Sequence, residues 1–435
     1  MQELFLQIKN INSIVWGIPM LSLLLGTHLF FTFRSKFIQK KLFKAIKLSV
    51  TSDDNGEGNM SSFASLTTTL AATLGTGNII GVSTAVAFGG PGAIFWCWIT
   101  GVLGMATSYV ECYLGVKYRV KDKDGTYLGG PMYSIENGLH SKSLAVLFAV
   151  CTMLASFGVG CTTQSNSIST TAYSMWGLSP YLIGFITAIV CGLVIVGGVK
   201  TIGNVCIKLV PAMGAFYLIG CFIILILNIQ YLFDAIKLIT TSAFLPRAMA
   251  GGFTGSTIKI AARYGVARGL FTNEAGLGSA AITAASAKTS DPKKQALVSM
   301  TATFWDTVVM CAITGLVIVT NMLKNPNSIT GFNSSEYTTA AFLSIPYIGD
   351  HILSIALIAF AIATLIGWSY FGENAIRYLF GIKSIKLYQI LYIVMIFIGA
   401  IMSLDFVWEL SDFINVFMAV PNLICIILLS KHIKY

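Results

Sequence analysis

Charged residues are scarce in this sequence. Only 11% of its 435 residues are Asp, Glu, Lys or Arg, while 55% are hydrophobic. Soluble domains carry about 25% charged residues, so a water-soluble protein of this length could not cover its surface with the charges present. The composition therefore excludes a soluble globular domain.

The residue patterns of common catalytic and metal sites are also missing. No CxxC pair, HExxH or GxSxG motif occurs. The nine cysteines lie mostly inside apolar runs, so we interpret them as small packing residues. The four histidines show no metal-ligand spacing: His28, His140, His351 and His432. We expect no enzymatic activity and no bound cofactor.

Long apolar runs are present instead. A membrane-spanning helix needs about 20 mostly apolar residues, and by hydropathy the chain supplies about eleven such spans. We therefore expect an all-α polytopic membrane protein. The expected spans are residues 12–33, 61–88, 91–116, 143–168, 181–199, 205–228, 244–287, 298–323, 351–372, 386–403 and 411–430. The first run lacks a positive n-region and a small-residue cleavage site, so we expect it to be a retained helix.

Lysine and arginine gather in alternate loops. Six lie between the first two spans: Arg34, Lys36, Lys40, Lys41, Lys44 and Lys47. The loops after the third, fifth, seventh and ninth spans are also basic, whereas the opposite loops hold acids such as Glu336 and Asp350. Cytoplasmic loops carry an excess of Lys and Arg. We therefore expect the N-terminus outside and the C-terminus in the cytoplasm, in an inner or plasma membrane.

This asymmetry accounts for the net charge of +10 without a nucleic-acid partner. One stretch does not fit. Lys259, Arg263 and Arg268 would lie in the outer half of the seventh span, where we interpret them as lining an aqueous vestibule.

Two of the expected spans contain helix-breaking segments. The second contains LGTGN at 74–78, and the seventh, which we expect to be interrupted, contains GLFTNEAGLGS at 269–279. A glycine in a helix interior costs about 1 kcal/mol relative to alanine, and inside a membrane an unwound backbone persists only where it lines a cavity or is buried in protein. Corresponding broken helices in two halves of a chain indicate a transporter binding site. Because the breaks are five spans apart, we expect inverted five-helix repeats at 61–228 and 244–430, with 12–33 as an extra helix.

Several motifs allow more than one interpretation. Residues 75–81 read GxGxxxG, one residue longer than a dinucleotide-binding fingerprint and without a βαβ unit. Close helix packing through small residues and an unwound stretch that holds a carboxylate and a cation both fit. Glu274 and Asp306 are acids inside spans, which default to functional roles, but either could pair structurally with Arg263, Arg268 or a backbone amide.

Two further residues are equally open. Gln164 ends the fourth span within a polar TTQSN segment, where it could bind a ligand or form an interhelical hydrogen bond. Trp368 could be an interfacial anchor, but its position well inside the ninth span favours a pocket wall.

Three long motifs resemble the alanine or glycine:cation symporter family, the sodium:alanine symporters. They are LGTGNIIGVSTAVAFGGPGAIFWCW at 74–98 with GGPMYSIENGL at 129–139, ARYGVARGLFTNEAGLGSA at 262–280, and LIGWSYFGENAIRYLFG at 365–381. The resemblance covers nearly the whole chain. It implies an amino-acid–polyamine–cation type of fold and import of alanine or glycine with sodium, sometimes with protons. One departure is Ala281, which stands where the family usually has proline, and we expect only a local effect on the helix.

The resemblance also implies roles for individual residues. Phe271 to Asn273 would be the second unwound segment, and Trp368 would limit the size of the substrate side chain. The implied substrate-binding residues are Thr76, Gly77, Asn78, Gln164, Phe271, Thr272, Asn273 and Trp368.

The expected Na⁺ site lies between the second and ninth spans. Thr364 occupies a place where this fold often has a cation-binding hydroxyl. The break frees backbone carbonyls at Leu74, and Asn78 adds an amide oxygen, the kind of oxygen that suits a hard cation. Asp306 is a further candidate ligand. Alternatively, Thr364 bonds only to its own helix one turn back.

These expectations describe a monomeric symporter that imports a small neutral amino acid with Na⁺. A cluster of neutral oxygens favours Na⁺ over H⁺ unless Asp306 is a ligand. The alternatives are a proton-coupled carrier that uses Asp306 or Glu274, a channel, and a membrane-embedded enzyme. A channel would need repeated pore rings, and an enzyme would need a convergent catalytic set, neither of which the sequence offers.

Overall fold

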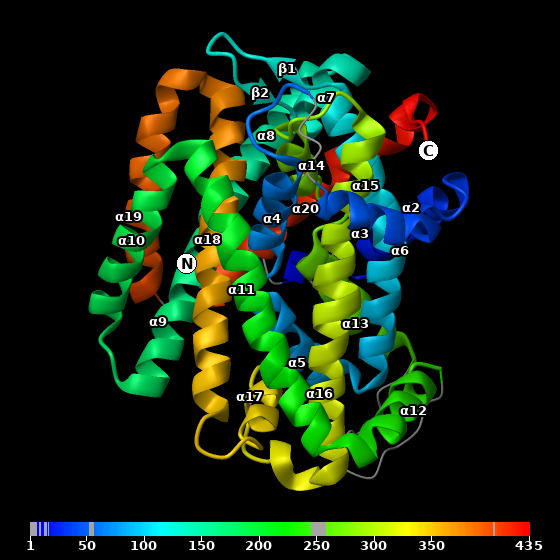
Figure 1. The fold of residues 1–435 in the computed structure, drawn as a ribbon, viewed down its shortest axis with the longest axis vertical. Helices are drawn as coiled ribbons and strands as arrows, with labels where there is room; N and C mark the ends of the chain where they lie inside the picture. The colour runs from blue at the N-terminus through cyan, green and yellow to red at the C-terminus, as the bar shows by residue number, and fades with distance from the viewer. Residues whose placement is uncertain are drawn as a thin grey trace.

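The computed structural model describes residues 7, 10–12, 15, 17–51, 56–244, 258–402 and 405–435, and most of these residues are helical (Figure 1). The helices of the first half are α2 (Ile18–Arg34), α3 (Leu42–Val50), α4 (Ser62–Thr73), α5 (Ile80–Gly89), α6 (Gly92–Lys117), α7 (Pro131–Leu139), α8 (Lys142–Phe157), α9 (Thr163–Trp176), α10 (Pro180–Val196), α11 (Gly198–Leu227) and α12 (Leu232–Ser242). Those of the second half are α13 (Ile258–Asn273), α14 (Ser279–Ala285), α15 (Pro292–Thr303), α16 (Ala312–Lys324), α17 (Tyr337–Phe342), α18 (Gly349–Phe380), α19 (Ile385–Ile401) and α20 (Asp405–Leu428).

Local sequence explains where several helices begin. Ser61 caps α4 by accepting a hydrogen bond from the amide of Ala64 at 3.1 Å, and Asp291 caps α15 through the amide of Lys293 at 2.9 Å. Proline stands in the first turn of α2, α7, α10 and α15, where its missing N–H costs nothing.

The all-helical membrane class is confirmed. Among the described residues, seven helices are long and apolar enough to cross a membrane, or eight if the bent pair α4–α5 is one span. The other expected spans correspond to shorter helices, α2, α10 and the α13–α14 pair. The count of eleven and the inverted repeat therefore stay predictions.

Two spans are longer than hydropathy indicated. The fourth was expected at 143–168, but α8 and α9 are joined by a π-helical turn at Gly158–Thr162 and continue to Trp176. The eighth was expected to begin at 298, but α15 begins at Pro292 and is joined to α16 by a π-helical segment at Phe304–Cys311. Residues 169–176 are rich in Ser and Thr, and residues 292–297 contain two Lys and one Gln. These residues lower the hydropathy although the helix continues.

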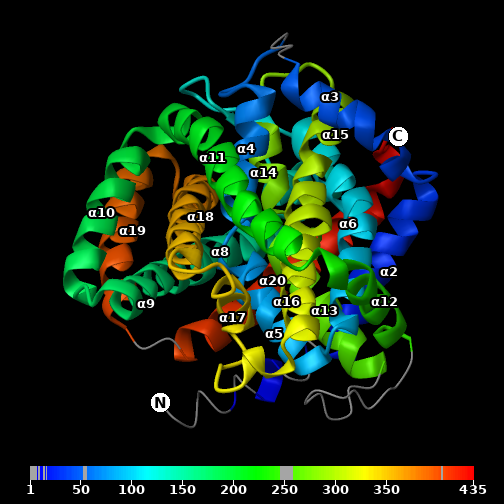
Figure 2. The ribbon, with the colours of Figure 1, turned by 60° about the horizontal axis from the view of Figure 1, so that its bottom comes forward.

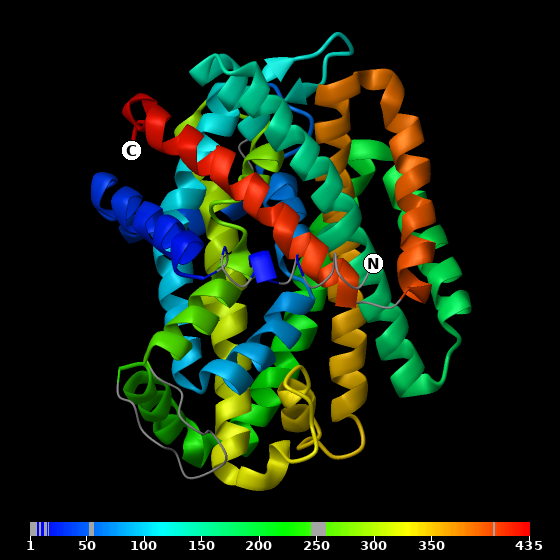
Figure 3. The same cartoon turned by 180° about the vertical axis from the view of Figure 1, so that it is seen from behind.

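The broken helices lie in the interior, surrounded by long helices. α6 packs along α13 and α15, and α18 packs against α4, α8, α9 and α11. α10 and α19 lie side by side at one edge of the molecule (Figure 2). On the opposite face from that in Figure 1, α20 crosses the molecule obliquely and α2 lies at one side (Figure 3).

The two ends of the molecule differ. One end carries a hairpin of β1 (Val120–Lys121) and β2 (Tyr127–Leu128) together with α7, and the other carries α12 and α17 (Figure 1). The basic loops that join α10 to α11 and α18 to α19 lie at the hairpin end. These short elements were not predicted, because none of them is long enough to give a hydropathy signal.

Arg119 closes the hairpin end. Its guanidinium donates to four backbone carbonyls, those of Glu57, Ala285, Ala287 and Thr289, at 2.7–3.1 Å. These carbonyls flank the starts of α4 and α15, and a parallel bridge between Met60 and Ala287 joins the same two segments. The Arg119 side chain thus links the segments next to both broken helices.

A charged cluster at the same end joins the hairpin to α18. Arg377 donates to Asp122 at 2.6 Å and to Asp124 at 2.5 Å. The backbone amide of Lys123 and the Arg377 guanidinium lower the pKa of Asp122. The carboxylate therefore stays charged at neutral pH, and its contribution to stability is lost only as the pH falls below the usual range of an aspartate.

Candidate substrate and cation site

The first break lies where the sequence predicted it. α4 ends at Thr73, Leu74 and Gly75 are not helical, residues 76–78 form a single 3₁₀ turn, and α5 begins at Ile80. The two arms meet at an angle of 61°. The amide of Gly75, freed from the helix, donates to Oδ1 of Asn78 at 3.0 Å. Residues 74–79 are therefore unwound, and two of their glycines also pack closely, because a β-carbon on Gly75 or Gly77 would lie within 3 Å of a neighbouring helix.

The second break lies further along the chain than predicted. α13 continues through Asn273, and the non-helical residues are 274–278. Phe271, Thr272 and Asn273 therefore lie in the last turn of α13, and the prediction that they form the unwound segment is wrong.

Two kinds of glycine explain the difference. Gly269 is a packing residue, because a β-carbon there would lie 3.0 Å from the carbonyl oxygen of Cys97 on α6. Gly276 and Gly278 have φ angles of +103° and +83°, which glycine adopts without strain. Glu274 also has a positive φ, at +54°. The helix consequently survives the first glycine and breaks only before the later two.

The two broken helices meet at Gly77. A β-carbon on Gly77 would lie 2.9 Å from Cγ2 of Thr272 and 3.5 Å from Cδ1 of Phe271. The close approach of α13 therefore requires glycine at this position. The structure thus brings the first unwound segment against the last turn of α13, as expected for one shared site.

Asp306 links the first break to α15 and α16. Nδ2 of Asn78 donates to Oδ1 of Asp306 at 2.7 Å, and the hydroxyl of Thr307 donates to Oδ2 at 2.6 Å. Thr307 also accepts a hydrogen bond from Nδ2 of Asn273 at 3.1 Å. All four side chains are buried. Asp306 lies in the π-helical segment, and such segments occur frequently at functional sites.

The acids are not paired with arginine. No salt bridge within the described part of the chain involves Asp306 or Glu274. Glu274 instead accepts from the indole Nε1 of Trp368 at 3.2 Å and from the hydroxyl of Ser279. The structural alternative in which Arg263 or Arg268 neutralises these acids is therefore wrong.

Thr364 and Gln164 lie beside the first break. The hydroxyl oxygen of Thr364 would be 2.8 Å from a β-carbon on Gly75, and it donates its proton to the carbonyl of Phe360 at 3.0 Å. This hydrogen bond to Phe360 uses the hydroxyl proton of Thr364 but leaves lone pairs on its oxygen, which can still accept a bond or coordinate a cation. Oε1 of Gln164 lies 3.4 Å from the hydroxyl of Thr76. Both side chains are therefore close enough to the break to contact anything bound there.

Trp368 is buried against the π-helical turn between α8 and α9. A β-carbon on Gly160 would lie 2.3 Å from Cβ of Trp368, so the glycine makes room for the indole. Only 1% of Trp368 is exposed, which excludes the role of an interfacial anchor. Its bond to Glu274 connects α18 directly to the second break.

Sequence reasoning gave no role to Glu111 or Asn422. Oε1 of Glu111, on α6, accepts from the amide of Gly276 at 2.8 Å and from Nδ2 of Asn422 on α20. Nδ2 of Asn422 also lies 2.9 Å from the carbonyl oxygen of Gly276. The pair therefore satisfies both the backbone N–H and the backbone carbonyl of Gly276 within the second break. The signal was available, because Glu111 is a third acid inside an expected span.

The geometry suits reversible binding of a small polar solute and a cation. Two breaks expose backbone amides and carbonyls, and buried hydroxyl, amide and carboxylate groups surround them. Backbone groups freed in broken helices hold substrates and coupling ions in secondary transporters. A helical membrane protein with two such helices in contact is of the secondary-transporter class.

Comparison with known proteins agrees with this class. The model of the sodium:alanine symporter family matches residues 1–435, and the chain belongs to that family. The chain is 46% identical over 430 residues to the sodium/alanine symporter AgcS of Methanococcus maripaludis, covering 97% of this chain and 94% of that protein. It is 36% identical over 436 residues to the "Probable sodium/glutamine symporter GlnT" of Bacillus subtilis, covering 99% and 90%. The motif resemblance is therefore confirmed, and the family is one of transporters.

Two solved structures share the fold. MhsT in complex with L-phenylalanine has a TM-score of 0.60 and 17% identity, covering 87% of this chain and 91% of that chain. A Na⁺-coupled sialic acid symporter has a TM-score of 0.58 and 11% identity, covering 96% and 99%. At these identities the likeness concerns the fold alone.

Proposed function

We propose that this protein imports a small neutral amino acid, alanine or glycine, together with Na⁺ by alternating access around the two broken helices. The observation that carries the proposal is the close approach of the first break, at Gly77, to Thr272 in the last turn of α13, directly before the second break. The 46% identity to a sodium/alanine symporter supports both the coupling ion and the class of substrate.

The substrate would lie between the first unwound segment, the last turn of α13 and α18. Amides freed at Thr76 to Asn78 would hold its carboxylate, since backbone N–H groups at a helix break favour an anion. Gln164 would bind the polar end of the substrate. Trp368 and Phe271 would close the space for the side chain and leave room for a hydrogen or a methyl group.

The Na⁺ ion would bind between the first break and α18. The carbonyl of Leu74 and the hydroxyl of Thr364 are its proposed ligands. Asn78 is a weaker candidate than the sequence suggested, because its Oδ1 accepts the amide of Gly75. The carboxylate of Asp306 lies on the other side of Asn78 and is a candidate ligand for a second cation site.

One Na⁺ per substrate supplies enough energy for concentrative uptake. A charge that moves through 100 mV releases about 2.3 kcal/mol, and a tenfold Na⁺ gradient adds about 1.4 kcal/mol. Together these support roughly 500-fold accumulation of a neutral zwitterion. The protein would act as a monomer in the inner or plasma membrane, with its N-terminus outside.

A proton-coupled carrier of a small neutral solute is the second candidate. It is favoured by the two buried carboxyl groups, Asp306 and Glu274, which form no salt bridge within the described residues. A carboxyl group without a counter-charge in a buried site is suited to exchange a proton. In that case Asp306→Asn would abolish coupling.

Uptake by purified protein in liposomes tests both candidates. Radiolabelled alanine should accumulate when Na⁺ is placed outside and should not accumulate with K⁺ in its place. An imposed pH gradient in Na⁺-free buffer should drive no uptake. Accumulation driven by the pH gradient alone would replace Na⁺ with H⁺, and entry that never exceeds equilibrium would exclude a carrier coupled to either ion.

A further inference from the structure

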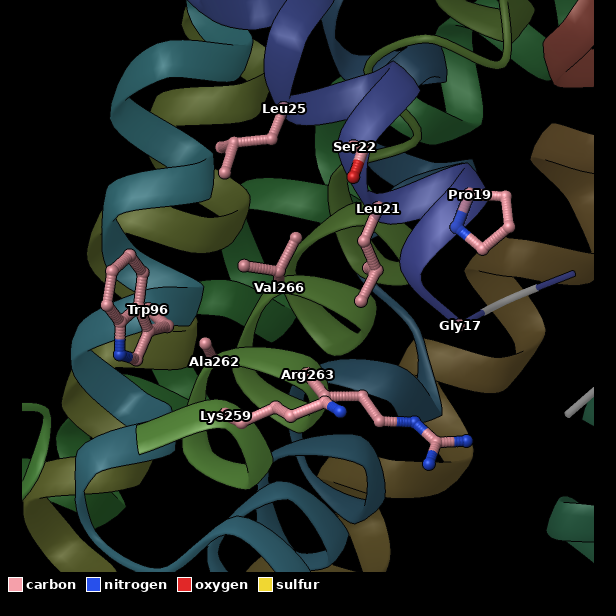
Figure 4. Close-up of a pocket in the computed structure, with 10 residues that line it drawn as sticks. All are labelled: Gly17, Pro19, Leu21, Ser22, Leu25, Trp96, Lys259, Ala262, Arg263 and Val266. Carbon is pink, nitrogen blue, oxygen red and sulfur yellow. The ribbon is translucent and has the colours of Figure 1, made fainter. Parts of the chain in front are cut away.

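A groove opens between α2, α6 and the first half of α13, and neither of the two unwound segments lines it (Figure 4). It has a volume of about 510 Å³. Its walls include Leu21 and Leu25 from α2, Trp96 from α6 and Val266 from α13. Lys259 and Arg263, one turn apart on α13, complete it. Nothing in the transport mechanism uses these residues.

The two cations have no anionic partner in the described protein. Both side chains are exposed, and neither forms a salt bridge with a described carboxylate. The guanidinium of Arg263 lies 5.7 Å from the ring centroid of Tyr264, which is its own neighbour in the chain. Figure 4 shows the two long side chains running in the same direction beneath Leu21 and Val266. The groove thus presents two adjacent positive charges at one border of an apolar wall.

The surface around the groove is apolar. Leu23, Trp98 and Ile258, on the same three helices, expose 39%, 43% and 39% of their area. α2 packs against α6 and α13, and Figure 3 shows it at one side of the molecule, between its middle and the end that carries the hairpin. α6 is long and apolar enough to cross a membrane, and the exposed apolar residues on this face suit contact with lipid. The aqueous vestibule inferred from the charges alone would need polar walls, and Ser22 is the single uncharged polar side chain among the lining residues.

Charge complementarity selects the occupant. An unpaired cation within a membrane-spanning segment is costly and is stabilised by an anion or by access to the head-group region. Basic pockets between transmembrane helices bind anionic lipid head groups. The apolar wall next to the cations matches an acyl chain attached to such a head group. We propose that this groove binds one anionic phospholipid, with its phosphate between Lys259 and Arg263 and an acyl chain along Leu21, Leu25 and Val266.

The proposed lipid would contact the transport machinery indirectly. α13 carries Thr272 and Asn273 on its last turn, and α2 lies outside the two proposed repeats. A lipid between them would stabilise the position of α13 relative to α2 and α6. The lipid site does not depend on which solute the protein carries.

Retention of lipid by the purified protein tests the proposal without a transport assay. Protein prepared in detergent should carry about one tightly held anionic phospholipid per chain by native mass spectrometry. After delipidation, phosphatidylglycerol should raise the apparent melting temperature, while phosphatidylcholine and inorganic phosphate should not. The double variant Lys259→Gln/Arg263→Gln should lose both the retained lipid and the thermal shift. A matched control, Lys44→Gln/Lys47→Gln, removes two exposed charges elsewhere and should keep both.

A second variant shows whether loss of the lipid results from the groove itself or from misfolding of the double variant. Ser22→Trp fills the groove without changing any charge and should also lose the lipid. Equal retention by the wild type and the double variant, when both elute as single folded species, would overturn the proposal. If phosphatidylcholine raised the melting temperature as much as phosphatidylglycerol does, the groove would bind lipid through its apolar wall alone. Stabilisation by inorganic phosphate without retained lipid would make it a simple anion site, and either result contradicts an anionic phospholipid site.

Discussion

The side-chain amide nitrogen of Asn78 lies 2.7 Å from Oδ1 of Asp306, although the two residues are 228 positions apart in the chain. The bond joins the unwound part of one broken helix to the π-helical segment of another span. It also fixes the orientation of Asn78, whose Oδ1 accepts from Gly75. The first break is therefore held from both sides, by its own backbone and by a buried acid.

Thr364→Val should raise the Na⁺ concentration needed for half-maximal uptake. The change keeps the shape of the side chain and removes the oxygen that faces Gly75. Loss of one polar interaction of about 0.5–1.5 kcal/mol corresponds to a roughly 2- to 12-fold increase. Uptake at saturating Na⁺ should change little, and Thr364→Ser, which keeps the oxygen, should resemble the wild type. If Thr364→Val leaves Na⁺ dependence untouched while Asp306→Asn abolishes coupling, the cation site belongs around Asp306.

Trp368→Ala should broaden the range of transported amino acids. The indole is buried beside the second break, and its removal would admit larger side chains such as leucine. Because one methylene changes discrimination by only about 1–3 kcal/mol, rejection of large substrates must be mainly steric. Competition of unlabelled leucine and phenylalanine against alanine uptake measures the change.

Trp368→Phe is the control for this substitution. Truncation of a buried tryptophan costs about 3–5 kcal/mol, so the protein level of Trp368→Ala must be checked. Trp368→Phe keeps an aromatic ring but loses the bond to Glu274 and part of the indole volume, and it should remain more selective than Trp368→Ala. An unchanged substrate range in a folded Trp368→Ala variant would remove this residue from the pocket wall.

Glu111→Ala should raise the substrate KM and lower thermal stability. It leaves the amide of Gly276 and the side chain of Asn422 without their shared acceptor, at a cost of about 1–3 kcal/mol for each buried group. Glu111→Gln retains an acceptor oxygen and should restore most of the function. A variant with wild-type KM and melting temperature after Glu111→Ala would show that the second break does not depend on this residue.

Arg119→Gln should loosen the hairpin end of the molecule. The guanidinium joins four carbonyls from segments next to both broken helices, and a loss of about 1–3 kcal/mol predicts a roughly 5- to 150-fold faster exposure of buried sites. The rate at which a permeant thiol reagent modifies a Thr69→Cys variant measures this exposure, because Thr69 is buried against Thr283. Lys117→Gln removes a neighbouring charge and should leave the rate unchanged. Identical rates in Arg119→Gln and the wild type would exclude Arg119 as a closing residue.

Cysteine labelling should place the hairpin end in the cytoplasm. All nine native cysteines are buried, so they give a low background. Lys44→Cys should be protected from an impermeant reagent added to intact cells. Tyr347→Cys, at a residue that is 97% exposed and close to α17, should react readily. The reverse pattern would invert the topology.

The sequence by itself determined the class of protein and the position of the first break. Scarcity of charge and long apolar runs are sufficient to identify membrane helices, because the bilayer admits few other structures. The LGTGN segment breaks its helix where predicted, because two glycines together with Asn and Thr within five residues disfavour a helix whatever the segment packs against. The family was evident from motifs that are contiguous in the chain.

Only the tertiary structure decided where the second break lies and what each buried acid contacts. Gly269 and Gly276 look alike in the sequence, yet one lies against α6 as a packing residue and the other adopts a positive φ. Asp306 bonds to Asn78, Glu274 to Trp368, and Glu111 to Asn422. Each pair comes from helices far apart in the chain. Hydropathy and glycine spacing are properties of neighbouring residues, whereas the partner of a buried polar group depends on which helices pack together.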